Sequence, residues 1–227
     1  MADKTHLSLI RACFKERFFI LLVSLMGLMV ISPMSEEFII LKLLLDIFVT
    51  IVFISSIYAV SNKKIVVCIS FALALPMFIS MWVPVSAKVP SLTLTGDLFG
   101  IFFMAFIVFE ILSFIFKERD ISPNIIYASI VAYLLLAVMW AFIYKVIETL
   151  QPGSFSASQK IVGDGRSLFS YYSFVTITTL GYGDITPIKG AARAFSMLEA
   201  VIGQIYLVVL IARLVGINIA QTMNREE

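Results

Sequence analysis

The sequence predicts an all-α integral membrane protein with six transmembrane helices. Of its 227 residues, 60% are hydrophobic and only 14% are charged, and the mean hydropathy is +1.01. An ordinary soluble domain has about 25% charged residues, so this chain cannot cover itself with a water-compatible surface. Apolar runs that approach the length of a membrane span recur six times. The basic residues of the short loops concentrate in every second loop, and therefore on one side of the membrane.

The six apolar runs set the predicted spans, because a helix that crosses the hydrocarbon needs about 20 mostly apolar residues. The first run is short and follows several basic residues, a pattern that a signal peptide shares. Since no small-residue cleavage site follows it, we interpret it as a retained helix. A further apolar run is too short to span and is expected to be a re-entrant half-helix. The spans are 18–31, 38–60, 65–83, 98–116, 125–147 and 194–215, and the half-helix covers about 167–178.

The loop charges predict the orientation. Cytoplasmic loops carry an excess of lysine and arginine, so the side richer in these residues is the inner side, and both termini are expected in the cytoplasm, with the chain in the cell membrane. The predicted outer side holds Glu36, Glu37, Lys88, Asp97 and the long segment 148–189. The predicted inner side holds Lys4, Arg11, Lys15, Arg17, Lys63, Lys64, Lys117, Arg119, Arg213 and Arg225.

The segment between the last two spans has an unusual order of composition. It starts polar, becomes apolar at "SLFSYYSFVTITT" and ends with "LGYGDITPIKG". Irregular backbone at membrane depth is tolerated only where protein buries it or where it lines water. Gly181 and Gly183 can adopt backbone angles that other residues avoid, which lets successive carbonyls point the same way. A ring of such carbonyls could replace the hydration shell of an ion.

The stretch "TTLGYGD" resembles the selectivity-filter signature of potassium channels, Thr-Val-Gly-Tyr-Gly-Asp. The likeness extends over about 125–216 and is similar to the pore module of bacterial channels with a two-helix pore. It implies a pore domain at 121–227, with an outer helix at 125–147, a pore helix at 167–178, the filter at 179–183 and an inner helix at 194–215. Residues 1–120 would then form a peripheral four-helix bundle in the position of a voltage sensor.

The resemblance assigns potassium sites to the carbonyls of Thr179, Leu180, Gly181 and Tyr182, with the Thr179 hydroxyl at the inner end. Gly183 closes the motif. One chain supplies one filter strand, and four strands are needed to encircle an ion. The resemblance therefore implies a homotetramer, with potassium as the permeant ion and no other cofactor.

The residues that would support the filter depart from the family pattern. Leu180 replaces the usual valine, and Tyr171 and Tyr172 stand where the family often has two tryptophans, so the aromatic cuff that would receive the Tyr182 ring is smaller. Asp184 would brace the filter at the outer mouth, next to supporting positions that include Thr178. An acidic pair with Asp184 is absent, because Val175 occupies a position that is glutamate in some relatives.

Four intramembrane residues are further candidates for a functional role. Gly203, twenty residues after Gly183, matches the hinge glycine of the family, or it lets neighbouring helices approach. Glu199 could face the region behind the filter or set the field near the cavity, and a hydrogen bond to the pore helix is slightly favoured. Asp46 could pair with Lys42, four residues earlier on the same predicted helix. Glu110 has no partner that the sequence can name.

The expected function is a potassium-selective channel that is not steeply voltage-gated. Voltage sensing needs several charges that move through the field, whereas the run "LFGIFFMAFIVFEILSFIF" contains no basic residue. The alternatives are a weakly selective cation channel and a transporter-type or non-conducting membrane subunit. The net charge of +2 disfavours nucleic acid as a partner, and the sequence contains no motif of an enzyme. We expect no soluble regulatory domain after the pore.

Overall fold

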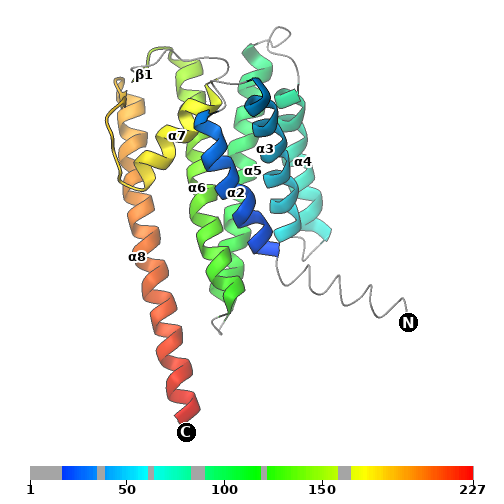
Figure 1. The fold of residues 1–227 in the computed structure, drawn as a ribbon, viewed down its shortest axis with the longest axis vertical. Coiled ribbons are helices and arrows are strands. Elements are labelled where there is room, and N and C mark those ends of the chain that lie inside the picture. The colour runs from blue at the N-terminus through cyan, green and yellow to red at the C-terminus, as the bar shows by residue number, and fades with distance from the viewer. Residues whose placement is uncertain are drawn as a thin grey trace, which may run out of the picture.

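The computed structural model describes residues 17–34, 39–60, 64–82, 90–118, 122–157 and 165–226. Long helices that run roughly antiparallel dominate this part of the chain (Figure 1). The helices are α2 (Arg17–Met34), α3 (Ile39–Ala59), α4 (Lys64–Trp82), α5 (Pro90–Lys117), α6 (Pro123–Leu150), α7 (Arg166–Ile177) and α8 (Gly190–Glu226), and the strands are β1 (Phe155–Ala157) and β2 (Ile185–Pro187).

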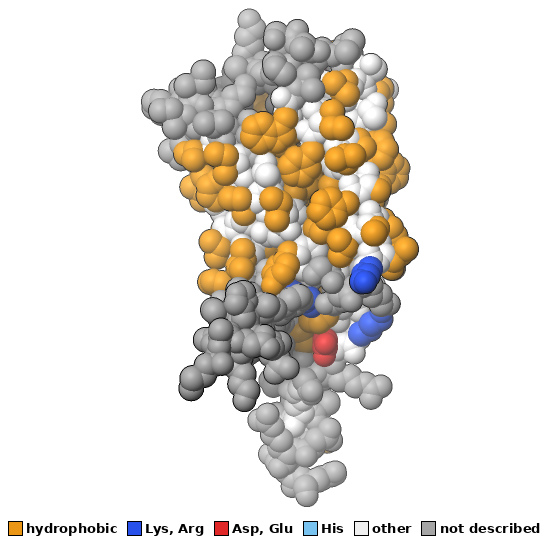
Figure 2. Space-filling view, turned by 90° about the vertical axis from the view of Figure 1, so that its right-hand side faces the viewer, with side chains coloured by type: hydrophobic (Ala, Val, Ile, Leu, Met, Phe, Trp, Pro, Cys, Tyr) orange, Lys and Arg blue, Asp and Glu red, His pale blue; other side chains and the backbone are white. Residues whose placement is uncertain are grey.

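The helices have the composition of membrane spans. Within the described residues, α4, α5, α6 and α8 are each long and apolar enough to cross a bilayer, and α2 and α3 contribute shorter apolar stretches. Hydrophobic side chains cover a broad band of the face in Figure 2, and the basic side chains visible there lie at the lower border of this band. The prediction of a mostly helical membrane protein is therefore confirmed at this level.

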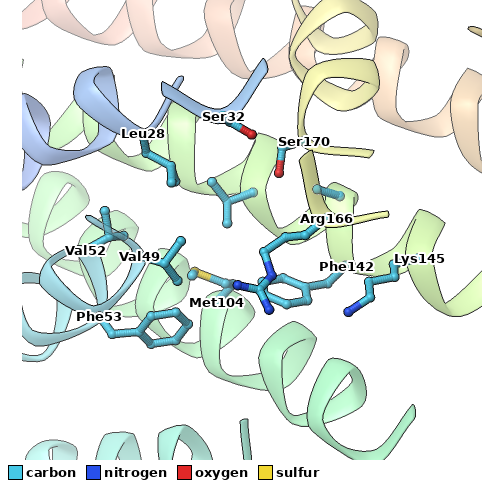
Figure 3. Close-up of a pocket in the computed structure, with 12 residues that line it drawn as sticks. Leu28, Ser32, Val49, Val52, Phe53, Met104, Phe142, Lys145, Arg166 and Ser170 are labelled. Carbon is cyan, nitrogen blue, oxygen red and sulfur yellow. The ribbon is translucent and has the colours of Figure 1, made fainter. Parts of the chain in front are cut away.

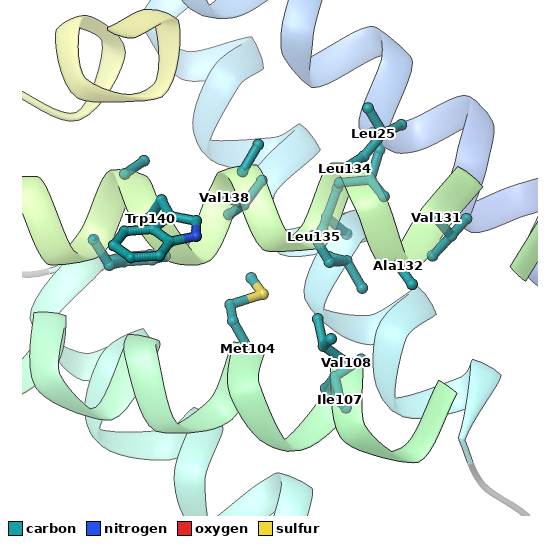
Figure 4. Close-up of a cluster of buried hydrophobic side chains, with 14 of the residues drawn as sticks. Leu25, Met104, Ile107, Val108, Val131, Ala132, Leu134, Leu135, Val138 and Trp140 are labelled. Carbon is teal, nitrogen blue, oxygen red and sulfur yellow. The ribbon is translucent and has the colours of Figure 1, made fainter. Parts of the chain in front are cut away.

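The helices form two groups that meet at α6. In one group α4 packs along α5, and α2 packs along α3, while both α2 and α5 also contact α6. The side chains at this junction are apolar and buried, as Figure 4 shows for Leu25 of α2, Met104 and Ile107 of α5, and Leu135 and Val138 of α6. On the other side of α6 lie α7 and α8, with α8 at the edge of the molecule (Figure 1).

A narrow cavity marks the boundary between the two groups (Figure 3). It is lined by apolar side chains of α2, α3, α5 and α6, while Ser32, Lys145, Arg166 and Ser170 supply its polar groups. Beside it, the Ser167 hydroxyl of α7 donates a hydrogen bond to the Ser32 carbonyl of α2. This bond joins the first helix directly to the short helix that precedes the glycine-rich stretch.

Two helices are longer than predicted. Helix α5 begins at Pro90 rather than near residue 98, because proline is well suited to the first turn of a helix, where its missing N–H is not needed. Asp97, which we expected in an outer loop, consequently lies inside α5 and is buried. The last helix starts four residues earlier than expected and continues to Glu226, well past the apolar run.

The long outer segment also contains a small β-ribbon that the all-helical expectation omits. Strands β1 and β2 pair antiparallel, with Phe155 opposite Pro187 and Ala157 opposite Ile185. The Ile188 N–H extends the pairing by donating to the Ser154 carbonyl at 2.8 Å. The ribbon ties the segment that follows α6 to the segment that follows the GYG motif.

Asp97 and Lys145 form a buried ion pair between α5 and α6, with 2.9 Å between Lys145 Nζ and Asp97 Oδ1. Removing one partner of a buried pair leaves a charge without compensation, which costs about 3–5 kcal/mol. We expect Lys145→Met to lower the thermal unfolding temperature of the protein in detergent micelles. The double variant Asp97→Leu, Lys145→Met should recover most of the loss, because it removes both charges. Lys64→Met, at an exposed position, is the control; a single variant as stable as the parent would contradict the prediction.

Candidate functional site

The short helix α7 and the chain that follows it form a re-entrant unit. In Figure 1, α7 slopes inward from the end of the molecule that carries β1, and the chain then returns alongside α8 to β2. The helix begins after Gly165, whose φ of 71° lies in the left-handed region. It ends at Ile177, and the backbone N–H and the hydroxyl Oγ1 of the next residue, Thr178, both donate to the Phe174 carbonyl. The helical pattern breaks at Thr179, which has a positive φ and donates from its N–H to the Thr176 carbonyl, directly at the start of the predicted filter.

After Thr178 the backbone angle φ alternates in sign from one residue to the next and is positive at every second residue. Thr179, Gly181 and Gly183 have φ values of 60°, 57° and 78°, whereas Leu180 and Tyr182 do not have positive φ. Glycine adopts such angles readily, but a β-branched residue with positive φ is a genuine outlier. Thr179 is the only non-glycine residue with positive φ in the described part of the chain. Strain of this kind persists where the surroundings enforce it and is typical of functional sites.

Three hydrogen bonds enforce this conformation. The Thr179 N–H donates to the Thr176 carbonyl at 2.9 Å, and the N–H groups of Leu180 and Gly181 donate to the Val175 carbonyl at 3.0 and 3.2 Å. In a trans peptide unit the C=O points opposite to the N–H of the next residue. Because these three N–H groups point back to α7, the carbonyls of Thr178, Thr179 and Leu180 point away from it.

The side of the stretch that faces away from α7 is open in the single chain. Residues 178–184 are all exposed, in contrast to Val175 and Ile177 on α7, which are buried. The Tyr182 side chain is 66% exposed, so Tyr171 and Tyr172 of the same chain do not enclose its ring. A cover for this ring would have to come from outside the described chain.

The two tyrosines of the predicted cuff have different partners. The Tyr171 hydroxyl donates to Asp184 Oδ2 at 2.7 Å, and the Ile185 N–H donates to Asp184 Oδ1 at 3.1 Å. Burial and this hydrogen bond raise the pKa of the Tyr171 phenol to about 12, so the phenol remains a donor at neutral pH. Tyr172 instead shares a 2.7 Å hydrogen bond with Ser196 of α8. Tyr171 therefore supplies a partner for Asp184 in place of the missing glutamate.

Behind α7 lies a polar cluster that sequence reasoning identified only in part. Glu199 of α8 is fully buried, and its carboxyl group contacts the hydroxyl groups of Ser173 on α7 and Tyr144 on α6. The hydrogen bond to the pore helix was the interpretation favoured for Glu199, whereas Tyr144 and Ser173 were not singled out. A signal for this face exists, because Tyr133, Ala137, Trp140 and Tyr144 follow helical spacing along α6.

Gly203 lies where α8 crosses the end of α7. A Cβ at this position would stand 2.6 Å from Ile177 Cγ1 and 3.0 Å from the Ile177 carbonyl oxygen. That carbonyl also accepts a 2.9 Å hydrogen bond from the Tyr133 hydroxyl. The absence of a side chain at Gly203 thus permits a close helix contact directly before the filter stretch.

The remaining ionisable candidates lie away from this site. Asp46 is in α3, but its side chain, like that of Lys42, is outside the described residues. Glu110 of α5 lines a separate pocket together with Arg17, Lys117 and Glu118. It lies on the far group of helices and does not contribute to the filter.

The family comparison matches the part of the chain that contains this unit. Residues 130–219 match the model of a family described as "Ion channel". The similarity to this family is confined to that segment of the chain. The segment includes most of α6, all of α7, the GYG stretch and most of α8, so the expected resemblance in this region is confirmed.

A curated relative matches over a similar length. The protein LctB of Bacillus caldotenax is 33% identical over 87 residues, which make up 37% of this chain and 64% of that protein. The match therefore spans less than two thirds of the relative. No solved structure matches the chain.

Proposed function

We propose that this protein is a potassium-selective channel, with Thr179–Gly183 as its filter. The observation that carries the proposal is the direction of the carbonyls of Thr179 and Leu180, which point away from α7 toward the open side of the stretch. The alternation in the sign of φ, with positive values at Thr179, Gly181 and Gly183, allows the carbonyls that come after Leu180 to point in the same direction. Rings of backbone carbonyls are the selectivity elements of potassium channels.

The charge distribution of the unit favours a cation. Carbonyl oxygens on an exposed face carry partial negative charge, and the C-terminal end of α7 adds the negative end of a helix dipole. Helix α7 ends at Ile177, directly before the first of these carbonyls. In an apolar surrounding a cation is the natural partner for this row of oxygens.

The exposure of α8 supports assembly with three further copies of the chain. Residues on one stripe of α8 are buried or half-buried against the same chain, at Ala192, Ser196, Glu199, Gly203, Tyr206, Leu210 and Arg213. Other positions are apolar and open; Met197 and Val208, for instance, are both 66% exposed. A helix that is apolar on all sides must be buried in protein or lipid. Four copies would close the filter around an axis and cover part of this surface.

Helix α5, which lies fourth in the order α2, α3, α4 and α5, offers little for voltage sensing. Between residues 98 and 116, α5 has no lysine or arginine, so it lacks the charges that a steep voltage response requires. We therefore propose a channel of the cell membrane without a voltage sensor of that kind. The basic residues near the ends of α2, α4, α5 and α8 favour a cytoplasmic location for both termini under the positive-inside rule.

Ion flux in liposomes tests the function. We expect the purified full chain to show a reversal potential set by potassium in mixed potassium and sodium, with a permeability ratio above about 10, equal to about 1.4 kcal/mol of discrimination. Similar permeabilities would instead indicate the weakly selective cation channel. Failure of a cross-linked tetramer to conduct any ion would indicate a non-conducting subunit.

A further inference from the structure

The carboxyl group of Glu199 lies at the meeting point of the three pore helices. It projects from the buried stripe of α8, with Oε1 in contact with the Ser173 hydroxyl of α7 and Oε2 in contact with the Tyr144 hydroxyl of α6. All three residues have zero relative exposure. A carboxyl group at such a place is costly unless its charge is compensated or absent.

The hydrogen atoms of this cluster can be counted. Ser173 Oγ lies 2.7 Å from the Ala137 carbonyl oxygen, which can only accept, and it also contacts Glu199 Oε1. A serine hydroxyl has one hydrogen to donate. If that hydrogen goes to Ala137, the contact with Glu199 needs a second hydrogen, and only the carboxyl group can supply it. Without a hydrogen atom between them, Ser173 Oγ and Glu199 Oε1 would repel one another at hydrogen-bonding distance.

The surroundings of Glu199 contain no compensating cation among its contacts in the described residues. The titratable groups near it are the phenols of Tyr144 and Tyr133 on α6 and of Tyr172 on α7, which are neutral at physiological pH. On α8 itself, Ser196 donates to the Ala192 carbonyl at 2.8 Å and shares its hydroxyl with Tyr172. An ionised carboxylate here would be a buried charge without a counter-ion, whereas a carboxylic acid satisfies every contact.

We propose that Glu199 is a protonated positioning residue, which donates to Ser173 and accepts from Tyr144. In this form it bonds the inner helix α8 to the pore helix α7 and the outer helix α6. Because Ile177, one turn after Ser173, contacts Gly203 and Tyr133, the cluster sets the position of α7 from which the filter starts. The consequence for conduction rests on the proposed function, but the protonation state does not.

Infrared difference spectroscopy tests the protonation state without any measurement of flux. At neutral pH the parent protein should show the C=O stretching band of a protonated carboxyl group, and Glu199→Gln should lack it. Glu110→Gln, which removes the glutamate of α5, is the matched control and should retain the band. Absence of the band from the parent, or its persistence in Glu199→Gln, would overturn the proposal whether or not the protein selects potassium.

Flux measurements on the same variants test the positioning role. Glutamine can donate to Ser173 and accept from Tyr144 without a charge, so Glu199→Gln should keep the potassium-to-sodium permeability ratio within about twofold of the parent value. Glu199→Ala leaves the buried hydroxyl groups unpaired and should reduce this ratio roughly tenfold. Alkaline pH should lower potassium flux in the parent and leave Glu199→Gln unchanged. Equal damage in both variants would show that the charged carboxylate is required and would refute the proposal.

Discussion

Replacing Gly181 with alanine is expected to abolish potassium-selective flux while leaving the chain folded and inserted in the membrane. Gly181 has a φ of 57°, and an L-residue in this region costs roughly 1–2 kcal/mol. The nearest atom to a Cβ would be the Thr179 carbonyl oxygen at 4.0 Å, so the penalty comes from the backbone and not from crowding. In the proposed tetramer the penalty applies in all four filter strands.

The strain has a specific route of relief. If the peptide unit before residue 181 rotates, the hydrogen bond from the Gly181 N–H to the Val175 carbonyl, now 3.2 Å long, is lost. The Leu180 carbonyl rotates with that unit and leaves the open side of the filter. We therefore expect the loss in selectivity to exceed the loss in stability, as measured by reversal potentials and by thermal unfolding in detergent.

Gly153 provides a matched control for Gly181. It has a φ of 75°, no atom lies within 4 Å of the point that a Cβ would occupy, and it belongs to the turn between α6 and β1. Gly153→Ala should lower stability by about 1–2 kcal/mol and leave the potassium-to-sodium ratio unchanged. Equal effects of the two substitutions on selectivity would show that the loss of selectivity does not depend on the filter stretch. A fully selective Gly181→Ala protein would refute the assignment of Gly181 to the filter.

The helices were predictable because the bilayer imposes their length and composition. The apolar runs at 125–147 and 65–83 differ from α6 and α4 by three residues or fewer at each end. The short run at 167–178 was recognised as a half-helix for the same reason, since it cannot span. Positive φ at Gly181 and Gly183 followed from the freedom of glycine.

The contacts between helices could not be predicted, because they join residues far apart in sequence. The sequence predicted Asp97 in a loop, whereas the structure places it in α5 beside Lys145, which lies 48 residues later in the chain. Glu199 meets Tyr144 across 55 residues, and an apolar helix gives no indication of which hydroxyl it faces. The left-handed conformation of Thr179 opposes the preference of a β-branched residue and arises only from the carbonyls at the end of α7.

A Gly203→Ala substitution is expected to disrupt the pore even though alanine is the better helix former. The substitution should gain up to about 1 kcal/mol of helix propensity, but the new methyl group would lie 2.6 Å from Ile177 Cγ1 and 3.0 Å from a backbone oxygen. Overpacking of this kind costs about 1–3 kcal/mol, and the backbone oxygen cannot move aside as a side chain can. The clash should therefore prevail and push α8 away from the start of the filter.

A double-mutant cycle with Ile177 separates this packing role from a hinge. If Gly203 is needed for close approach, Gly203→Ala should cost less stability and less potassium flux in an Ile177→Ala background, because the nearest clashing atom is gone; the contact with the Ile177 carbonyl should leave part of the cost. If Gly203 is instead needed as a hinge, alanine restricts the backbone at this position whether or not Ile177 is present. The effects of the two substitutions on stability and flux should then be additive. Gly216→Ala, on the same helix with nothing within 4 Å of its Cβ position, should be neutral or slightly stabilising, since it gains propensity without a clash.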